Sequence, residues 1–116
     1  MPFTLSLKRP FVADHFHDLP GFQEDRHGHN WEVEATVALA AEADEAAFVM
    51  ALDMWVEAID YHLLNQLPAL AGRNPTAEVL AELVFRHLQD ASLQPRSVRI
   101  REKANYWALC RGVDPS

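Results

Sequence analysis

The chain has 116 residues, of which 49% are hydrophobic, and a formal net charge of −7 at pH 7. This length and apolar content predict one folded domain over residues 1–116, neither two domains nor a disordered chain. The negative charge argues against a nucleic-acid-binding surface. No segment approaches the roughly 20 apolar residues of a membrane-spanning helix, so we expect no membrane partner. A single cysteine, Cys110, permits no disulfide within the chain, which agrees with a reducing compartment such as the cytoplasm.

Two extended strands are predicted first. Residues 4–17 form one stretch, and Pro10 within it predicts a bend or a sheet edge, because proline has no backbone N–H for a ladder. From Trp31 to Leu39 apolar residues alternate with more polar ones. This alternation indicates an antiparallel strand with one buried face.

Two helices are predicted next. Between about Glu45 and His62 the apolar residues are spaced for one helical face, and Asp44 is the expected N-cap. Asn74 is expected to cap a second helix, with Pro75 in its first turn. We expect Trp55 in the core beneath the first helix and His87 on the surface of the second; these two assignments follow from helical spacing alone.

Two further strands are predicted at the end of the chain. Pro95 is expected in a connecting loop, followed by strands at Val98–Glu102 and Tyr106–Cys110 across a tight turn. The order ββααββ predicts an α+β fold with a four-stranded antiparallel sheet and two helices on one face. Such a sheet has two open edges, so we expect a homo-oligomer in which these edges are paired.

Three histidines form the most informative pattern. His27 and His29 stand two residues apart on an extended strand and therefore face the same side, and His15 on the neighbouring strand can complete a three-imidazole metal site. Three protein ligands are typical of catalytic zinc, whereas structural zinc normally has four. Because Cys110 is far from this cluster in sequence, we expect Zn²⁺ with its fourth position left for water or substrate. The alternative is a set of ordinary strand or surface histidines.

Five short segments carry a family resemblance over nearly the whole chain: Phe11–His15, His27–Asn30, Asp60–Asn65, Asn74–Glu78 and Arg101–Lys103. In order and spacing they resemble the 6-pyruvoyltetrahydropterin synthase and 6-carboxytetrahydropterin synthase family. The resemblance implies the tunnelling fold, in which three subunits close one barrel and two rings commonly stack into a hexamer, with active sites between subunits. It also implies zinc held by His15, His27 and His29, and a substrate of the 7,8-dihydroneopterin triphosphate type.

The sequence departs from the family pattern at two catalytic positions. Gln23 stands where members that make the pyruvoyl or carboxy product carry a cysteine base. Glu24 resembles the glutamate that replaces this cysteine in a variant subgroup, for which the implied reaction cleaves the side chain to 6-hydroxymethyl-7,8-dihydropterin, a folate precursor. Asp60 resembles the family's catalytic aspartate, but Tyr61 occupies the place of its histidine partner. His62, one residue on, is the candidate substitute.

A further carboxylate, Glu102, suits substrate binding. The 2-amino and ring N–H groups of a pterin form a paired donor edge, and an ionised carboxylate can accept both hydrogen bonds. The simpler readings are that Glu24 is a solvated loop acid, that Asp60 is a polar residue of the last helical turn, and that Cys110 is a small core residue.

Two classes of function remain open. The first is a zinc-dependent lyase that acts on a dihydropterin by side-chain cleavage, with 6-carboxy-5,6,7,8-tetrahydropterin synthase of the queuosine pathway as the enzymatic alternative. The second is a non-catalytic zinc- and pterin-binding paralogue. Glu24 favours the enzyme, and Tyr61 favours the binding protein.

Overall fold

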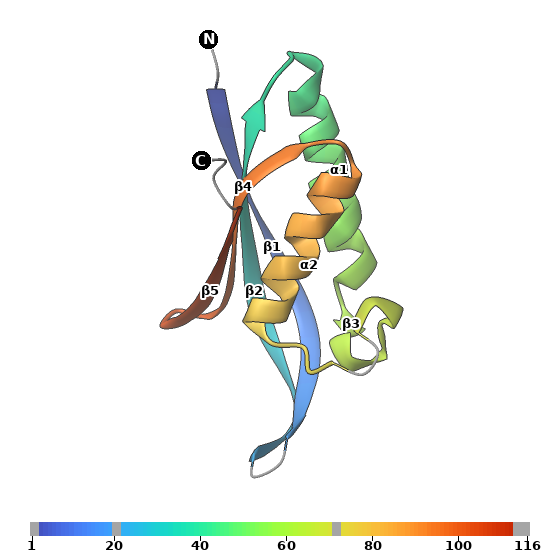
Figure 1. The fold of residues 1–116 in the computed structure, drawn as a ribbon. Coiled ribbons are helices and arrows are strands. Elements are labelled where there is room, and N and C mark those ends of the chain that lie inside the picture. Colours follow the sequence, from blue (N-terminus) through green and yellow to red (C-terminus); the bar gives the residue numbers. More distant parts are fainter. Residues whose placement is uncertain (1–2, 20–21, 71–72, 113–116) are drawn as a thin grey trace.

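A computed structural model describes residues 3–19, 22–70 and 73–112, with backbone pairing but no side chains for the strand residues between 15 and 29. Two helices cover one face of a five-stranded sheet of order β3-β1-β2-β4-β5 (Figure 1). This arrangement confirms the predicted α+β class, with two helices on one face of the sheet. Within the described ranges, no helix is long and apolar enough to cross a membrane.

The helices and strands follow one another with short connections. In chain order they are β1 (Phe3–Leu19), β2 (Phe22–Leu39), α1 (Ala43–Ile59), β3 (His62–Leu63), two 3-10 turns (Leu64–Gln66 and Pro68–Leu70), α2 (Ala77–Asp90), β4 (Gln94–Lys103) and β5 (Tyr106–Arg111). The four long strands pair antiparallel as predicted. The prediction of only four strands was wrong, because β3 adds a fifth strand that pairs parallel with β1. A two-residue strand has no periodicity by which a sequence could reveal it.

The first helix is shorter than predicted and is capped differently. It ends at Ile59, so His62 lies in β3 and not on the helix. Asp44 is not the N-cap but a residue of the first turn, and its Oδ2 accepts hydrogen bonds from the backbone N–H groups of Ala40 and Ala41. The carboxylate therefore fixes the loop that enters the helix.

The second helix begins two residues later than the Asn74 cap predicts. Thr76 is its N-cap, and the Thr76 Oγ1 accepts the backbone N–H of Val79 at 3.2 Å. Pro75 precedes this cap and lies outside the first turn. A threonine three residues before a free helical N–H satisfies that donor directly, which explains why it takes the position.

Both strand prolines lie where the ladder is incomplete. Pro10 is in β1, whose side away from β2 is paired, among the described residues, only at Ala13 and Asp14, so the predicted sheet edge is confirmed. Pro95 was expected in a loop but lies in β4, opposite Val37 and beside a shift in the β2–β4 register. Such irregular points tolerate a residue that cannot donate a ladder hydrogen bond.

The core lies between the helices and one face of the sheet. Phe11 of β1 stacks on Trp31 of β2, with ring centroids 5.8 Å apart, and meets the edge of Trp55 of α1 at 5.7 Å. The Trp31 indole N–H donates to the carbonyl of Ala13 at 3.2 Å. These contacts fix the β1–β2 hairpin to α1 just before the hairpin continues past the helices (Figure 1). The other fully buried large side chains are Phe48, Leu52, Leu64, Leu70, Leu80, Leu88, Ile100, Val33, Val37 and Val84.

Candidate active site

The β1–β2 pairing brings the three predicted metal-binding positions together. His15 lies directly opposite His27, and His29 lies opposite Ala13. Residues opposite each other on antiparallel strands share a face, as do residues two apart on one strand. The three histidine positions therefore occupy one face of the hairpin. It is the face on which Trp31, two residues beyond His29, is buried under the helices.

This donor set fits a zinc ion. Directly opposed Cα atoms in antiparallel strands lie about 4.5–5.5 Å apart, and residues two apart on a strand lie about 6.6 Å apart. Three imidazoles at these positions can converge on one ion at about 2 Å each and leave a fourth position open. Among the described side chains, which do not include these three histidines, no group of three or more His, Cys, Asp or Glu could hold a metal ion.

A bulge in β2 changes the register beside the histidines. His15 pairs with His27, but His17, two residues on, pairs with Glu24, three residues back along β2. The extra residue, within the pair Asp25 and Arg26, interrupts the alternation of faces. Glu24 thus takes a position on the same face as His17 and the histidine row. In a regular strand, residues three apart would lie on opposite faces.

The segment that follows α1 joins this site from the other side of β1. The Asp60 Oδ1 accepts the backbone N–H of Val12 at 2.8 Å, and the backbone N–H of Tyr61 donates to the Val12 carbonyl. His62 pairs with Ala13, which itself lies opposite His29, so His62 is one strand away from His15 and two strands away from His29. The His62 Nδ1 donates to the Asp60 carbonyl at 2.9 Å.

Tyr61, which stands in the place of the family histidine, has an unusual backbone. Its φ is 61°, in the left-handed region that β-carbon-bearing residues seldom adopt, and its side chain is 81% exposed. The left-handed residue ends α1 and redirects the chain into β3. Asp60 and His62 are therefore separated by a turn residue, and not by the helical step that the sequence had predicted.

Glu102 lies on the face that the helices cover, at the end of β4. It follows Val98 and Ile100 on that face and is 8% exposed, the one buried charged side chain among the residues whose burial is described. Glu32 of the neighbouring strand β2 pairs with Arg101. By this antiparallel register, Glu102 lies opposite Trp31. The predicted substrate-binding carboxylate is thus on the same face and the same end of the sheet as the histidine row.

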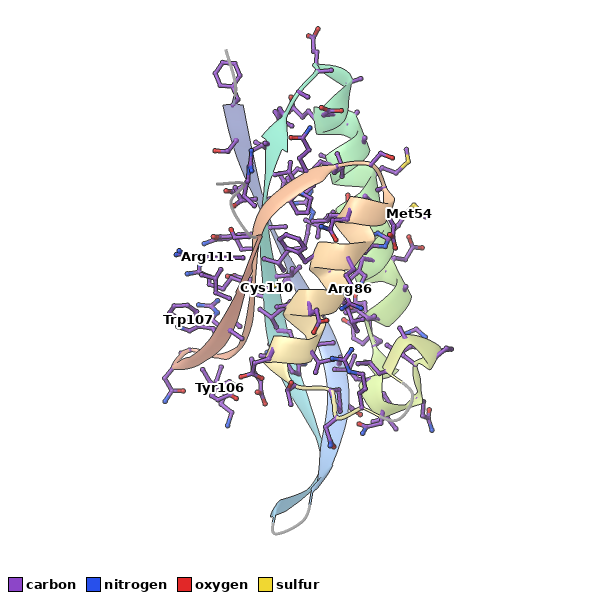
Figure 2. The ribbon with its side chains drawn as sticks, viewed as in Figure 1. Met54, Arg86, Tyr106, Trp107, Cys110 and Arg111 are labelled. Carbon is purple, nitrogen blue, oxygen red and sulfur yellow. The ribbon has the colours of Figure 1, made fainter. Side chains whose placement is uncertain are left out.

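Tyr106 and Glu78 complete this end of the sheet and were not predicted. The Tyr106 hydroxyl donates to the Glu78 Oε1 at 3.3 Å, which joins the start of β5 to the first turn of α2. Figure 2 shows Tyr106 beside the β4–β5 turn. Burial, the charge of Glu78, its hydrogen bond and the charge of Glu102 together raise the pKa of Tyr106. The sequence carries no spacing signal for this contact, because it depends on the β4–β5 register.

The comparisons with known proteins identify the family. The family model of 6-pyruvoyl tetrahydropterin synthase matches residues 4–113. This chain belongs to that family. Within it, the chain is 30% identical over 104 residues to an Archaeoglobus fulgidus protein with the provisional name 6-carboxy-5,6,7,8-tetrahydropterin synthase, covering 82% of this chain and 85% of that protein.

Solved structures of the 6-pyruvoyl tetrahydropterin synthase family share the fold. The Caenorhabditis elegans 6-pyruvoyl tetrahydropterin synthase superposes with a TM-score of 0.80 at 17% identity and 97% coverage of both chains. The Plasmodium vivax 6-pyruvoyltetrahydropterin synthase, at 11% identity, covers 95% of this chain and 97% of its own with a TM-score of 0.66. It was solved as variants in which a glutamate named as the catalytic residue is replaced by cysteine or alanine.

The opposite face of the sheet carries two arginines that pair with glutamates of β2. Arg101 pairs with Glu32 at 3.1 Å, and Arg99 pairs with Glu34 at 3.4 Å. The Arg99 guanidinium also lies 5.3 Å from the ring centroid of Trp107, which is 52% exposed and therefore not a core residue of the described chain. These cations are on the other side of the sheet from the histidine row.

His87 and Cys110 contribute to the packing of the fold and lie outside the candidate site. His87 is half-buried, and its Nε2 donates to the Ala51 carbonyl of α1 at 2.8 Å, so the prediction of a plain surface position was wrong. The hydrogen bond ties α2 to α1. Cys110 is half-buried and packs against the hydrophobic core, as its interpretation as a small core residue requires.

Proposed function

We propose that this chain is a zinc-dependent lyase that cleaves the side chain of 7,8-dihydroneopterin triphosphate, or a related dihydropterin, to 6-hydroxymethyl-7,8-dihydropterin. Enzymes of its family are lyases that act on pterins. The observation that carries the proposal is the β2 bulge, which gives Glu24 a position on the face of the histidine row. A metal site and a carboxylate base on one face are what this cleavage requires.

In this proposal His15, His27 and His29 hold the zinc ion. When bound, zinc would polarise the two side-chain hydroxyls of the substrate and lower the cost of removing a proton from them. The donor set supports this role, since three imidazoles leave a coordination position for substrate oxygen.

Glu24 acts as the base. Its carboxylate takes the proton from the hydroxyl on the second side-chain carbon, and the bond between the first and second carbons breaks. The second carbon leaves as an aldehyde, and the electron pair left on the first carbon is delocalised into the ring imine. The proton then returns from Glu24 to the first carbon, which completes the hydroxymethyl group without any oxidant or reductant.

Glu102 and the Asp60–His62 segment have separate tasks in the proposal. Glu102 binds the 2-amino and ring N–H groups of the pterin, and its burial supports this because a charge-assisted hydrogen bond is strongest away from water. Asp60 holds the turn against β1 through Val12, and His62 is the candidate proton donor or acceptor on the other side of the histidine row.

The relatives support two versions of this chemistry. The catalytic glutamate named for the Plasmodium vivax enzyme supports Glu24 as a replacement for the cysteine base. The provisional name of the Archaeoglobus fulgidus relative favours the alternative, a 6-carboxy-5,6,7,8-tetrahydropterin synthase. Gln23, which replaces the cysteine associated with that product, argues for the first version. A non-catalytic zinc- and pterin-binding paralogue is the third candidate, and Tyr61 in place of the histidine favours it.

The role of Glu24 can be tested with a matched pair of variants. Glu24→Gln should retain zinc and pterin binding but lower turnover by roughly two to four orders of magnitude, the usual contribution of a positioned base. Asp25→Asn removes the neighbouring carboxylate from the bulge and should leave turnover within a few-fold of the wild type. Full activity of Glu24→Gln, or an equal loss in both variants, would remove Glu24 from the mechanism.

A further inference from the structure

The β4–β5 ladder contains a bulge at Glu102. Arg101 pairs with Trp107, and the next pair is Lys103 with Tyr106, so two residues of β4 lie opposite one residue of β5. Ile100 pairs with Ala108 on the helix-covered face, and Glu102 and Tyr106 are the next positions of that face on their strands. The bulge therefore makes Tyr106 the cross-strand neighbour of Glu102, about 5 Å away between backbones.

One hydrogen bond orients the hydroxyl of Tyr106, whose side chain is 46% exposed. The hydroxyl donates its proton to the Glu78 Oε1 at 3.3 Å. A phenol that donates its one hydrogen can still accept hydrogen bonds through its oxygen lone pairs. Burial, and then the carboxylates of Glu78 and Glu102, raise the pKa of Tyr106 above a value at which the phenol is already protonated at neutral pH, so the hydroxyl keeps its hydrogen for this donation.

We propose that Tyr106 is a specificity-determining residue, whose oxygen accepts one hydrogen of a ligand's 2-amino group while Glu102 accepts the other and the adjacent ring N–H. Glu78 is the positioning residue that holds the Tyr106 hydroxyl in the accepting orientation. The proposal rests on the assignment of Glu102 as the pterin-binding carboxylate. It goes further by naming Tyr106 as the residue that, together with Glu102, distinguishes a 2-amino-4-oxopteridine from a 2,4-dioxopteridine.

The selection follows from the polarity of the groups that meet the ligand. A 2-amino group offers two N–H donors to the acceptors of Tyr106 and Glu102. A 2-oxo group in the same place is an acceptor and would face the lone pairs of both residues. A site built to hydrogen-bond an N–H rejects an analogue with an acceptor in the same place, because two acceptors that face each other lose water without gaining a hydrogen bond.

Two fluorescent pteridines can test this with the full-length protein. The probes are pterin (2-amino-4-oxopteridine) and lumazine (2,4-dioxopteridine), with dissociation constants measured by titration at pH 7. We expect the wild type to bind pterin at least about tenfold more tightly than lumazine. Tyr106→Phe should weaken pterin binding about fivefold, the value of one ordinary hydrogen bond, and leave lumazine binding unchanged or stronger.

Two more variants separate the roles of the residues. Glu78→Ala should reduce the preference for pterin in the same direction, because the freed hydroxyl can turn its hydrogen toward the ligand. Trp107→Phe, one residue along β5 and on the opposite face, should leave both constants unchanged. A preference for pterin that survives both Tyr106→Phe and Glu78→Ala would overturn the proposal.

The same measurement separates this inference from the proposed function. Pterin binding that is lost in Glu102→Gln but unaffected by Tyr106→Phe would leave the function intact and exclude Tyr106 from specificity. A wild type that binds neither pteridine, or a Glu102→Gln variant with unchanged pterin affinity, would contradict the assignment of Glu102 and this inference with it. Thermal unfolding of each variant shows whether it is folded under the titration conditions.

Discussion

Cys110 shows how the surroundings of one side chain set its chemistry. Burial and the charge of Glu82 raise the pKa of its thiol above the usual 9.0, and Arg86 opposes this shift. The thiolate is the reactive form of cysteine, so the native protein holds Cys110 in its unreactive form at neutral pH. This agrees with a packing role against the core and leaves the catalytic chemistry to other residues.

The reactivity of Cys110 can be measured directly. We expect alkylation by iodoacetamide at pH 8 to be several-fold slower in the native protein than in the same protein unfolded in urea, because both thiolate fraction and access increase on unfolding. Cys110→Ala should retain pterin turnover. Alkylation of the native protein as fast as that of the unfolded chain would show that the Cys110 thiol is not buried and that its pKa is not raised.

Residue types and spacing were enough to predict some site residues but not others. His15, His27, His29 and Glu102 could be proposed because each residue type has a defined chemistry at a recognisable position. Tyr106 could not, since its contact with Glu78 joins residues 28 positions apart through a bulge. The structure does not describe the side chains of the three histidines and Glu24. The roles of these four residues therefore stay predictions, which the backbone register supports.

At the scale of elements, alternation predicted the long strands and helical spacing predicted both helices. The ends of the helices and strands were harder to predict from the sequence, because they depend on single hydrogen bonds. Thr76 caps α2 where Asn74 had been expected, and α1 stops at Ile59 when Asp60 and Tyr61 bind the backbone of Val12. The bulges in β2 and β4 leave no periodic signal, yet the first sets the face of Glu24 and the second brings Tyr106 beside Glu102.

The hairpin register gives a prediction about metal content. Replacing His27 and His29 together by alanine removes two of three neighbouring donors, so we expect purified protein to lose the stoichiometric zinc of the wild type. Elemental analysis of both proteins after identical dialysis measures this. His17→Ala changes a histidine of the same hairpin outside the proposed ligand set and should retain the metal. Full zinc occupancy in the double variant would exclude the hairpin site.

At the scale of the whole molecule, a single subunit exposes apolar side chains to solvent. Within the described ranges, β5 ends the sheet on one side, and on the other β1 is covered by β3 over two residues alone. Exposed apolar side chains lie along these edges and on the face opposite the helices, including Phe3, Trp107 and Leu109. Open edges of this kind are normally paired or protected, which supports assembly with further copies of the chain.

We therefore expect a ring built from trimers, with the histidine row near a boundary between subunits. Light scattering coupled to size-exclusion chromatography should give a mass three or six times that of the 13.1 kDa chain at micromolar concentration. A charge such as Leu109→Glu on the exposed side of β5 should weaken assembly, whereas Glu57→Gln on the outer face of α1 should not. A monomer at every concentration tested would contradict the ring.

The central claim is that this family member cleaves the pterin side chain with Glu24 as base. The most direct measurement is to incubate the zinc-loaded protein with 7,8-dihydroneopterin triphosphate and identify the products by mass spectrometry. The account predicts 6-hydroxymethyl-7,8-dihydropterin as the main pterin product, formed at least about a hundredfold more slowly by Glu24→Gln. A main product of 6-carboxytetrahydropterin, or an unchanged substrate that is nevertheless bound, would contradict it.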